Sequence, residues 1–194
     1  MPNWCNNTLS IQPVDDQPES ETQFETLVLT IKNLLAAKVE FMEAFYPPPA
    51  DLENNNDWCD ANWGTKWDIE PEIIEDDDHW FKIAFASAWS PPIKFFEWLA
   101  PQCNKLFFNL DYYEKGNAFI GEAAFEGDSF HDDCRNMTSD DLKEIYGDDY
   151  EEDEFEEDAL EEAVKAAVKE AAEAYRQSKD DDLYNEFSFD EGEI

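Results

Sequence analysis

The chain has 194 residues and a formal net charge of −36, because 49 aspartates and glutamates outnumber 13 lysines and arginines. It is also 42% hydrophobic and 15% aromatic, and this content excludes a purely disordered acidic polymer. The charge excludes direct binding of nucleic acid, whose phosphates are contacted by lysine and arginine, and it disfavours an anionic membrane surface.

The first predicted elements are a strand over residues 6–12 and a helix over residues 21–37. The helix is predicted from apolar residues at helical spacing, and either Ser20 or Thr22 is expected to cap its start. The Asn- and Asp-rich residues 51–63 are expected to form an irregular loop.

Two strands are predicted next, over residues 67–74 and 80–88, separated by an acidic turn at residues 75–78. In the second strand, alternation places four residues on one face: Phe81, Ile83, Phe85 and Ser87. A proline pair then opens a second helix, which extends to about residue 100. Ser90 is expected to cap it.

The last two predicted strands, over residues 106–113 and 118–125, form a hairpin. The complete order is strand, helix, strand, strand, helix, strand, strand. This order predicts a ferredoxin-like α+β fold with one extra strand, in which two helices cover one face of an antiparallel sheet.

The charge divides the chain into two parts. Residues 1–126 hold 23 acidic and 7 basic residues, a net charge of −16, whereas residues 127–194 hold 26 and 6, a net charge of −20. We therefore predict a ferredoxin-like domain over residues 1–126 and an acidic helical extension over residues 127–194. No signal peptide and no membrane helix are expected.

The extension is expected to contain a short helix over residues 139–146, an acidic run, and a longer helix over residues 156–178. The longer helix has an apolar stripe at helical spacing, formed by Leu160, Val164, Val168 and Tyr175. This stripe is predicted to pack on the open face of the sheet or on a second copy of the chain in a homodimer.

Three short motifs occur in order: MPNWCNN at residues 1–7, NWGTKWD at residues 62–68 and AWSPP at residues 88–92. Together they resemble the YubB-type ferredoxin-like domain family of plasmid and phage proteins. The resemblance covers residues 1–126. It implies a ferredoxin-like fold, a mobile-element origin and a location in the bacterial cytoplasm, and it leaves the acidic extension unaccounted for.

The second motif has two interpretations. Trp63, Lys66, Trp67 and Asp68 could form a pocket for a small polar ligand or a flipped base, since aromatic walls and a few charged groups suit such a site. The alternative is architectural, with the tryptophans packing against the sheet and the charged residues at its rim.

No catalytic residue, metal site or cofactor is predicted. His79 and His131 lie in acidic segments, and neither is near a recognisable nucleophile motif. The four cysteines lack the close spacing of a zinc site, and the Asp runs lack the glycine of a calcium-binding loop. We therefore expect the cysteines to be reduced thiols. We also expect that the protein is not an enzyme.

The predicted function is to mimic nucleic acid. The partner would be a basic host protein that binds DNA or RNA, of the restriction or CRISPR class, and the carboxylates would take the place of phosphates. The alternative is an acidic interaction or chaperone-like module that binds a basic partner without competing with nucleic acid. The expected partner-binding residues are Asp76, Asp77, Asp78, Asp148, Asp149, Glu151, Glu152, Asp153, Glu154, Glu156, Glu157 and Asp158.

Overall fold

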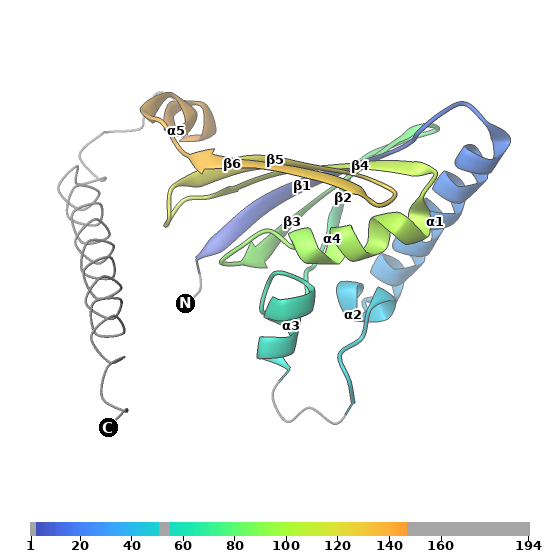
Figure 1. The fold of residues 1–194 in the computed structure, drawn as a ribbon, viewed down its shortest axis with the longest axis horizontal. Helices are drawn as coiled ribbons and strands as arrows, with labels where there is room; N and C mark the ends of the chain where they lie inside the picture. Colours follow the sequence, from blue (N-terminus) through green and yellow to red (C-terminus); the bar gives the residue numbers. More distant parts are fainter. Residues whose placement is uncertain (1–2, 51–54, 147–194) are drawn as a thin grey trace, which may run out of the picture. The chain divides into compact units, whose positions relative to one another are not determined.

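A computed structural model of the chain describes residues 3–50 and 55–146 (Figure 1). Its strands are β1 (Trp4–Pro13), β2 (Glu72–Asp77), β3 (Trp80–Ala88), β4 (Leu106–Glu114), β5 (Phe119–Glu126) and β6 (Ser129–Asn136). Its helices are α1 (Pro18–Ala37), α2 (Phe41–Phe45), α3 (Asn56–Asn62), α4 (Ile93–Leu99), the 3-10 helix η1 (Ala100–Cys103) and α5 (Ser139–Tyr146). The chain divides into two compact units, Met1–Ser139 and Asp140–Ile194.

The first unit is built on one antiparallel sheet with the strand order β2-β3-β1-β4-β5-β6. The predicted α+β class with an antiparallel sheet is confirmed. The strands β1 to β4, with α1 and α4 between them, follow the connections of a split β-α-β unit. The strands β5 and β6 extend the sheet beyond β4.

In the described part of the chain the sheet has six strands instead of the five expected. The additional strand, β6, pairs with β5 along its whole length, from Phe119 opposite Asn136 to Glu126 opposite Ser129. Sequence reasoning missed β6 because all of its residues are exposed, so it has no apolar alternation. The expected domain boundary after residue 126 falls in the turn between β5 and β6.

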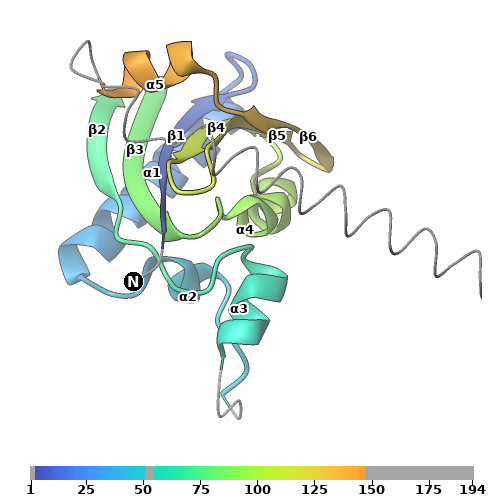
Figure 2. The same ribbon diagram turned by 90° about the vertical axis from the view of Figure 1, so that its left-hand side faces the viewer.

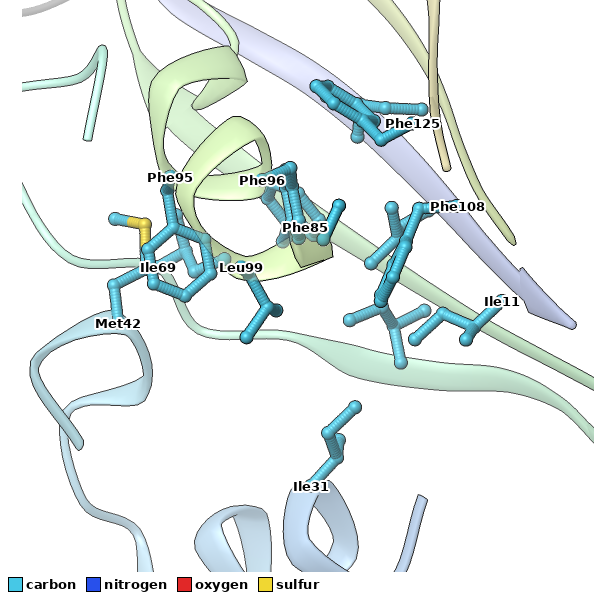
Figure 3. Close-up of a cluster of buried hydrophobic side chains, with 14 of the residues drawn as sticks. Ile11, Ile31, Met42, Ile69, Phe85, Phe95, Phe96, Leu99, Phe108 and Phe125 are labelled. Atoms are coloured by element: carbon cyan, nitrogen blue, oxygen red, sulfur yellow. The ribbon is translucent and has the colours of Figure 1, made fainter. Parts of the chain in front are cut away.

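The hydrophobic core lies between the sheet and the helices α1 and α4, which cover the same face (Figures 1 and 2). The predicted alternation along β3 is confirmed, because Phe81, Ile83, Phe85 and Ser87 are all buried. Phe85 of β3 lies beside Phe96 of α4, with ring centroids 6.3 Å apart (Figure 3). Burying side chains of this size contributes about 1.5–3 kcal/mol each.

Two predicted elements are displaced. The strand expected over residues 67–74 is β2 at Glu72–Asp77, so Asp76 and Asp77 lie in the strand, opposite Phe81 and Trp80. β2 is an edge strand whose six residues are all exposed, and charged residues at a sheet edge prevent pairing with other chains. The loop expected over residues 51–63 includes a helix, α3.

The residues expected to cap the two helices do not do so. For α1 this includes Thr22, whose hydroxyl donates to the carbonyl oxygen of Pro18 at 2.7 Å. α1 starts at Pro18, and Ser20 is buried within its first turn, where its hydroxyl donates to Asp15 at 2.5 Å. The hydroxyl of Ser90 donates to the carbonyl oxygen of Gly64 at 2.6 Å instead of capping α4. Both serines therefore tie a helix start to a neighbouring segment.

Candidate functional site

Asp76, Asp77 and Asp78, three of the expected partner-binding residues, lie at the end of β2 and in the turn that follows it. With Glu21 and Glu25 of α1 they line a hollow of about 530 Å³. We call this surface the acidic hollow. It brings carboxylates from two separate elements onto one concave surface, and the contribution of α1 was not predicted.

One of the three aspartates is neutralised within the protein. Lys32 of α1 forms an ion pair with Asp76, with Nζ 2.6 Å from Oδ2. Asp77 and Asp78 form no ion pair with any residue within 3–50 and 55–146, and both are exposed. Their carboxylates can therefore bind cationic groups from outside.

A second group of carboxylates lies on the last three strands, β4 to β6. In β4 and β5 these carboxylates are on the face of the sheet opposite to the buried residues. Asp111 of β4 is directly opposite Glu122 of β5, and Glu122 is directly opposite Asp133 of β6. All three side chains are exposed. We call this line the acid row. Since adjacent strands are about 4.8 Å apart, its three negative charges are evenly and closely spaced.

The acid row costs the fold stability, because like charges directly opposite each other on neighbouring strands repel. The pKa of Asp111 shows the effect. Partial desolvation is the largest cause and raises this pKa. The negative charge of Glu122 raises the pKa further, and nearby Lys82 lowers it. Functional sites often lower the stability of a protein in this way.

The Asp111→Asn substitution should stabilise the protein at pH 7 by a few tenths of a kcal/mol, the size of exposed charge interactions. The pKa of Asp111 is raised in the folded state, so ionisation of this group weakens the fold as pH rises through that pKa. The gain in stability should vanish at about pH 3, where Asp111 is protonated in the folded state and in the unfolded state. Urea unfolding at the two pH values measures this, with Glu126→Gln as the control. An equal gain at both would contradict it.

The remaining expected partner-binding residues lie outside the residues that the structure describes: Asp148, Asp149, Glu151, Glu152, Asp153, Glu154, Glu156, Glu157 and Asp158. The helix expected over residues 156–178 lies outside them as well.

The residues of the NWGTKWD motif differ in their surroundings. Trp63 is architectural: it is buried, and its Nε1–H donates to the carbonyl oxygen of Tyr46 at 3.0 Å. Asp68 accepts hydrogen bonds from the backbone N–H groups of Met42 and Glu43, both at 2.8 Å, and so anchors the start of α2. Trp67 is exposed, with 40% of its surface accessible.

The three sequence motifs meet at one end of the sheet. Trp67 lies between Trp4 and Trp89, with ring centroids 6.0 Å and 5.4 Å away. The ammonium group of Lys66 lies 4.6 Å from the centroid of the Trp89 ring. We call Trp4, Lys66, Trp67 and Trp89 the tryptophan cluster. Its rings form an aromatic surface on which Trp4 and Trp67 are exposed.

A further hollow of about 570 Å³ is lined by the start of α4 and by strands β4 to β6. Within it, the hydroxyl of Tyr112 donates to Asp132 at 2.5 Å. Burial and this hydrogen bond raise the pKa of Tyr112 above its usual range. Tyr112 is therefore a neutral hydrogen-bond donor that fixes β6 against β4, and it is not poised to lose its proton.

Metal-binding groups do not cluster in the part of the chain that the structure describes, where no three His, Cys, Asp or Glu side chains are placed to hold an ion. None of the described helices is long and apolar enough to cross a membrane.

The cysteines should differ sharply in reactivity. Burial raises the pKa of Cys5 to about 12 and that of Cys59 to about 11, whereas Cys134 is exposed. Because the thiolate is the reactive form, maleimide at pH 7.5 should modify Cys134 first and the two buried thiols only after denaturation. Mass spectrometry of peptides measures the order, and Cys134→Ser should remove the fast phase. Early labelling of Cys5 or Cys59 would contradict the burial.

No protein-family model matches the chain, and no curated protein matches it. Among solved structures, the fold is similar to the crystal structure of a protein api92 from Yersinia pseudotuberculosis, of the DUF1281 family. The similarity has a TM-score of 0.47 at 10% sequence identity, and it covers 72% of this chain and 99% of that one.

Proposed function

We propose that this protein binds the nucleic-acid-binding surface of a basic host protein and thereby excludes DNA or RNA from it. The acid row supports this proposal most directly. Its carboxylates lie on three adjacent strands of one sheet, opposite one another despite their repulsion. A nucleic acid backbone presents a similar line of closely spaced negative charges.

The acidic hollow is a second set of carboxylates, separate from the acid row, that a basic partner could contact. Asp77 and Asp78 are exposed and without an ion pair among the described residues, and Glu21 and Glu25 lie in the same hollow. The acids of residues 148–158, in a proposed acidic helical extension to a ferredoxin-like domain, are proposed to bind the same partner. The whole chain, at −36, would attract a basic partner over a long range.

Binding would follow from electrostatic complementarity. Arginines and lysines that normally contact phosphates would pair with the carboxylates, and each pair formed would relieve repulsion within the acid row. We place the partner among bacterial restriction or CRISPR proteins, which gives the protein an inhibitory role in the cytoplasm. No chemical step and no cofactor is required.

The experiment begins with capture of basic proteins on the immobilised full chain at low salt. Each captured protein is then tested for displacement by a duplex oligonucleotide and by a single-stranded RNA. The test variant neutralises the acid row with Asp111→Asn, Glu122→Gln and Asp133→Asn. The control variant removes the same charge from three exposed acids that are far apart in sequence, with Glu19→Gln, Asp57→Asn and Glu97→Gln.

The proposal predicts that nucleic acid displaces the protein from its partner and that affinity falls steeply with salt. The acid-row variant should bind about tenfold more weakly, since each exposed charge pair contributes up to about 1 kcal/mol, while the control variant should lose much less. If the captured partner binds this protein and nucleic acid together, mimicry is refuted. The protein would then be an acidic interaction or chaperone-like module.

A further inference from the structure

The tryptophan cluster combines large apolar side chains with exposure to solvent. Trp4 and Trp67 leave 49% and 40% of their surfaces accessible, although both lie in ring contact with neighbouring tryptophans. Exposed apolar residues that gather in a patch mark binding sites more often than isolated ones do. Tryptophan is also among the residues that contribute most to protein interfaces.

The backbone holds this cluster in place. Trp89 has a φ of 65°, a left-handed conformation that is strained for a tryptophan. Its N–H donates to the carbonyl oxygen of Asn3 at 2.9 Å, which joins the segment before β1 to the end of β3. The buried hydroxyl of Thr65 donates to the carbonyl oxygen of Ala88 and accepts from its N–H, both at 3.0 Å. The aromatic surface is therefore preorganised.

Lys66 indicates which chemical group this surface accepts. In a chain with 49 acidic residues, its ammonium group lies over the ring of Trp89 at 4.6 Å. It forms no ion pair with any residue in the described ranges. A cation placed over an indole ring is attracted by the electrons of the ring face. Lys66 thus occupies one ring of the cluster, while Trp4 and Trp67 remain exposed.

We propose that Trp4 and Trp67 bind an arginine side chain of a basic protein partner. The planar guanidinium group stacks on aromatic faces and is more weakly hydrated than the ammonium group of lysine. The negative charge of the chain favours an approaching basic segment. This inference rests on the proposed function for the basic nature of the partner, and it adds a site that selects arginine over lysine.

Two synthetic peptides, nona-arginine and nona-lysine, serve as probes because they carry equal charge. Their affinities for the full chain are measured by calorimetry, with quenching of tryptophan fluorescence as a second signal. The variants are Trp4→Leu, Trp67→Leu and the double substitution. Val39→Ala is the control, since Val39 is an apolar side chain with 50% of its surface exposed. Circular dichroism verifies that each variant is folded.

We expect nona-arginine to bind about 2–5-fold more tightly than nona-lysine for each ring that it contacts. The double variant should lose this preference, the Val39→Ala control should keep it, and Trp67→Phe, which retains an aromatic face, should keep most of it. Lys66→Gln should increase the preference, because it frees the Trp89 ring.

Equal binding of the two peptides, unaffected by the tryptophan variants, would overturn the arginine site and leave the proposed function standing. A preference for arginine that persists in the double variant would also overturn the site. If neither peptide binds at low salt, the proposal that the partner is basic is refuted. The proposed function then fails together with this inference.

Discussion

Replacing Phe96 by alanine should lower the free energy of unfolding by about 3–5 kcal/mol, the usual cost of removing a buried phenylalanine. Phe96 is 1% exposed, and its ring lies 5.2 Å from Phe95, 6.3 Å from Phe85 and 6.1 Å from Phe125. It therefore joins α4 to two strands of the sheet. The cavity left by alanine could not be filled by these rigid rings.

Chemical denaturation measures the loss, and Leu29→Ala provides the control. Leu29 is apolar but 60% exposed, so its truncation should change stability by less than about 0.5 kcal/mol. If the two substitutions had similar effects, Phe96 would not belong to the packed core described above.

Replacing Gly121 by alanine should cost about 1–3 kcal/mol, the range typical of overpacking. A Cβ atom at this position would overlap the Tyr112 ring and lie 2.8 Å from the carbonyl oxygen of Asp133. The ring could move only by giving up its hydrogen bond to Asp132, and the carbonyl belongs to the β6 backbone. We expect the pairing of β5 with β6 to loosen.

Hydrogen exchange of the β6 amides, together with urea unfolding, measures this effect. In a Tyr112→Leu background the same Gly121→Ala change should cost less, because the ring is no longer in the way. Additive costs of the two substitutions would show that Tyr112 is not the residue that excludes a side chain at Gly121.

The elements that sequence reasoning predicted well are those with an apolar face toward the core. β3 has alternating buried residues, and α1 buries residues at helical spacing, so both follow from their periodicity. β2 and β6 lie at the two edges of the sheet with every residue exposed. Neither has a pattern that distinguishes a strand from an acidic loop, and β6 was missed entirely.

The candidate sites were less predictable because they depend on contacts between distant segments. Asp111, Glu122 and Asp133 are unremarkable acids in the sequence, and only the pairing register of β4, β5 and β6 aligns them. For the tryptophan cluster the sequence did contain a signal, in three separate motifs. What it lacked was the information that Trp4 and Trp67 lie side by side.

The two edge strands have a consequence for the protein at high concentration. The free edge of a sheet is a template for aggregation through strand addition, and β2 and β6 are the two edges here. Both carry acids, among them Asp76 and Asp77 in β2 and Asp132 and Asp133 in β6. Two copies approaching edge to edge would repel each other as long as these groups are ionised. Colloidal stability is therefore coupled to pH, and the protein should self-associate when acidified toward its isoelectric point near 4.1.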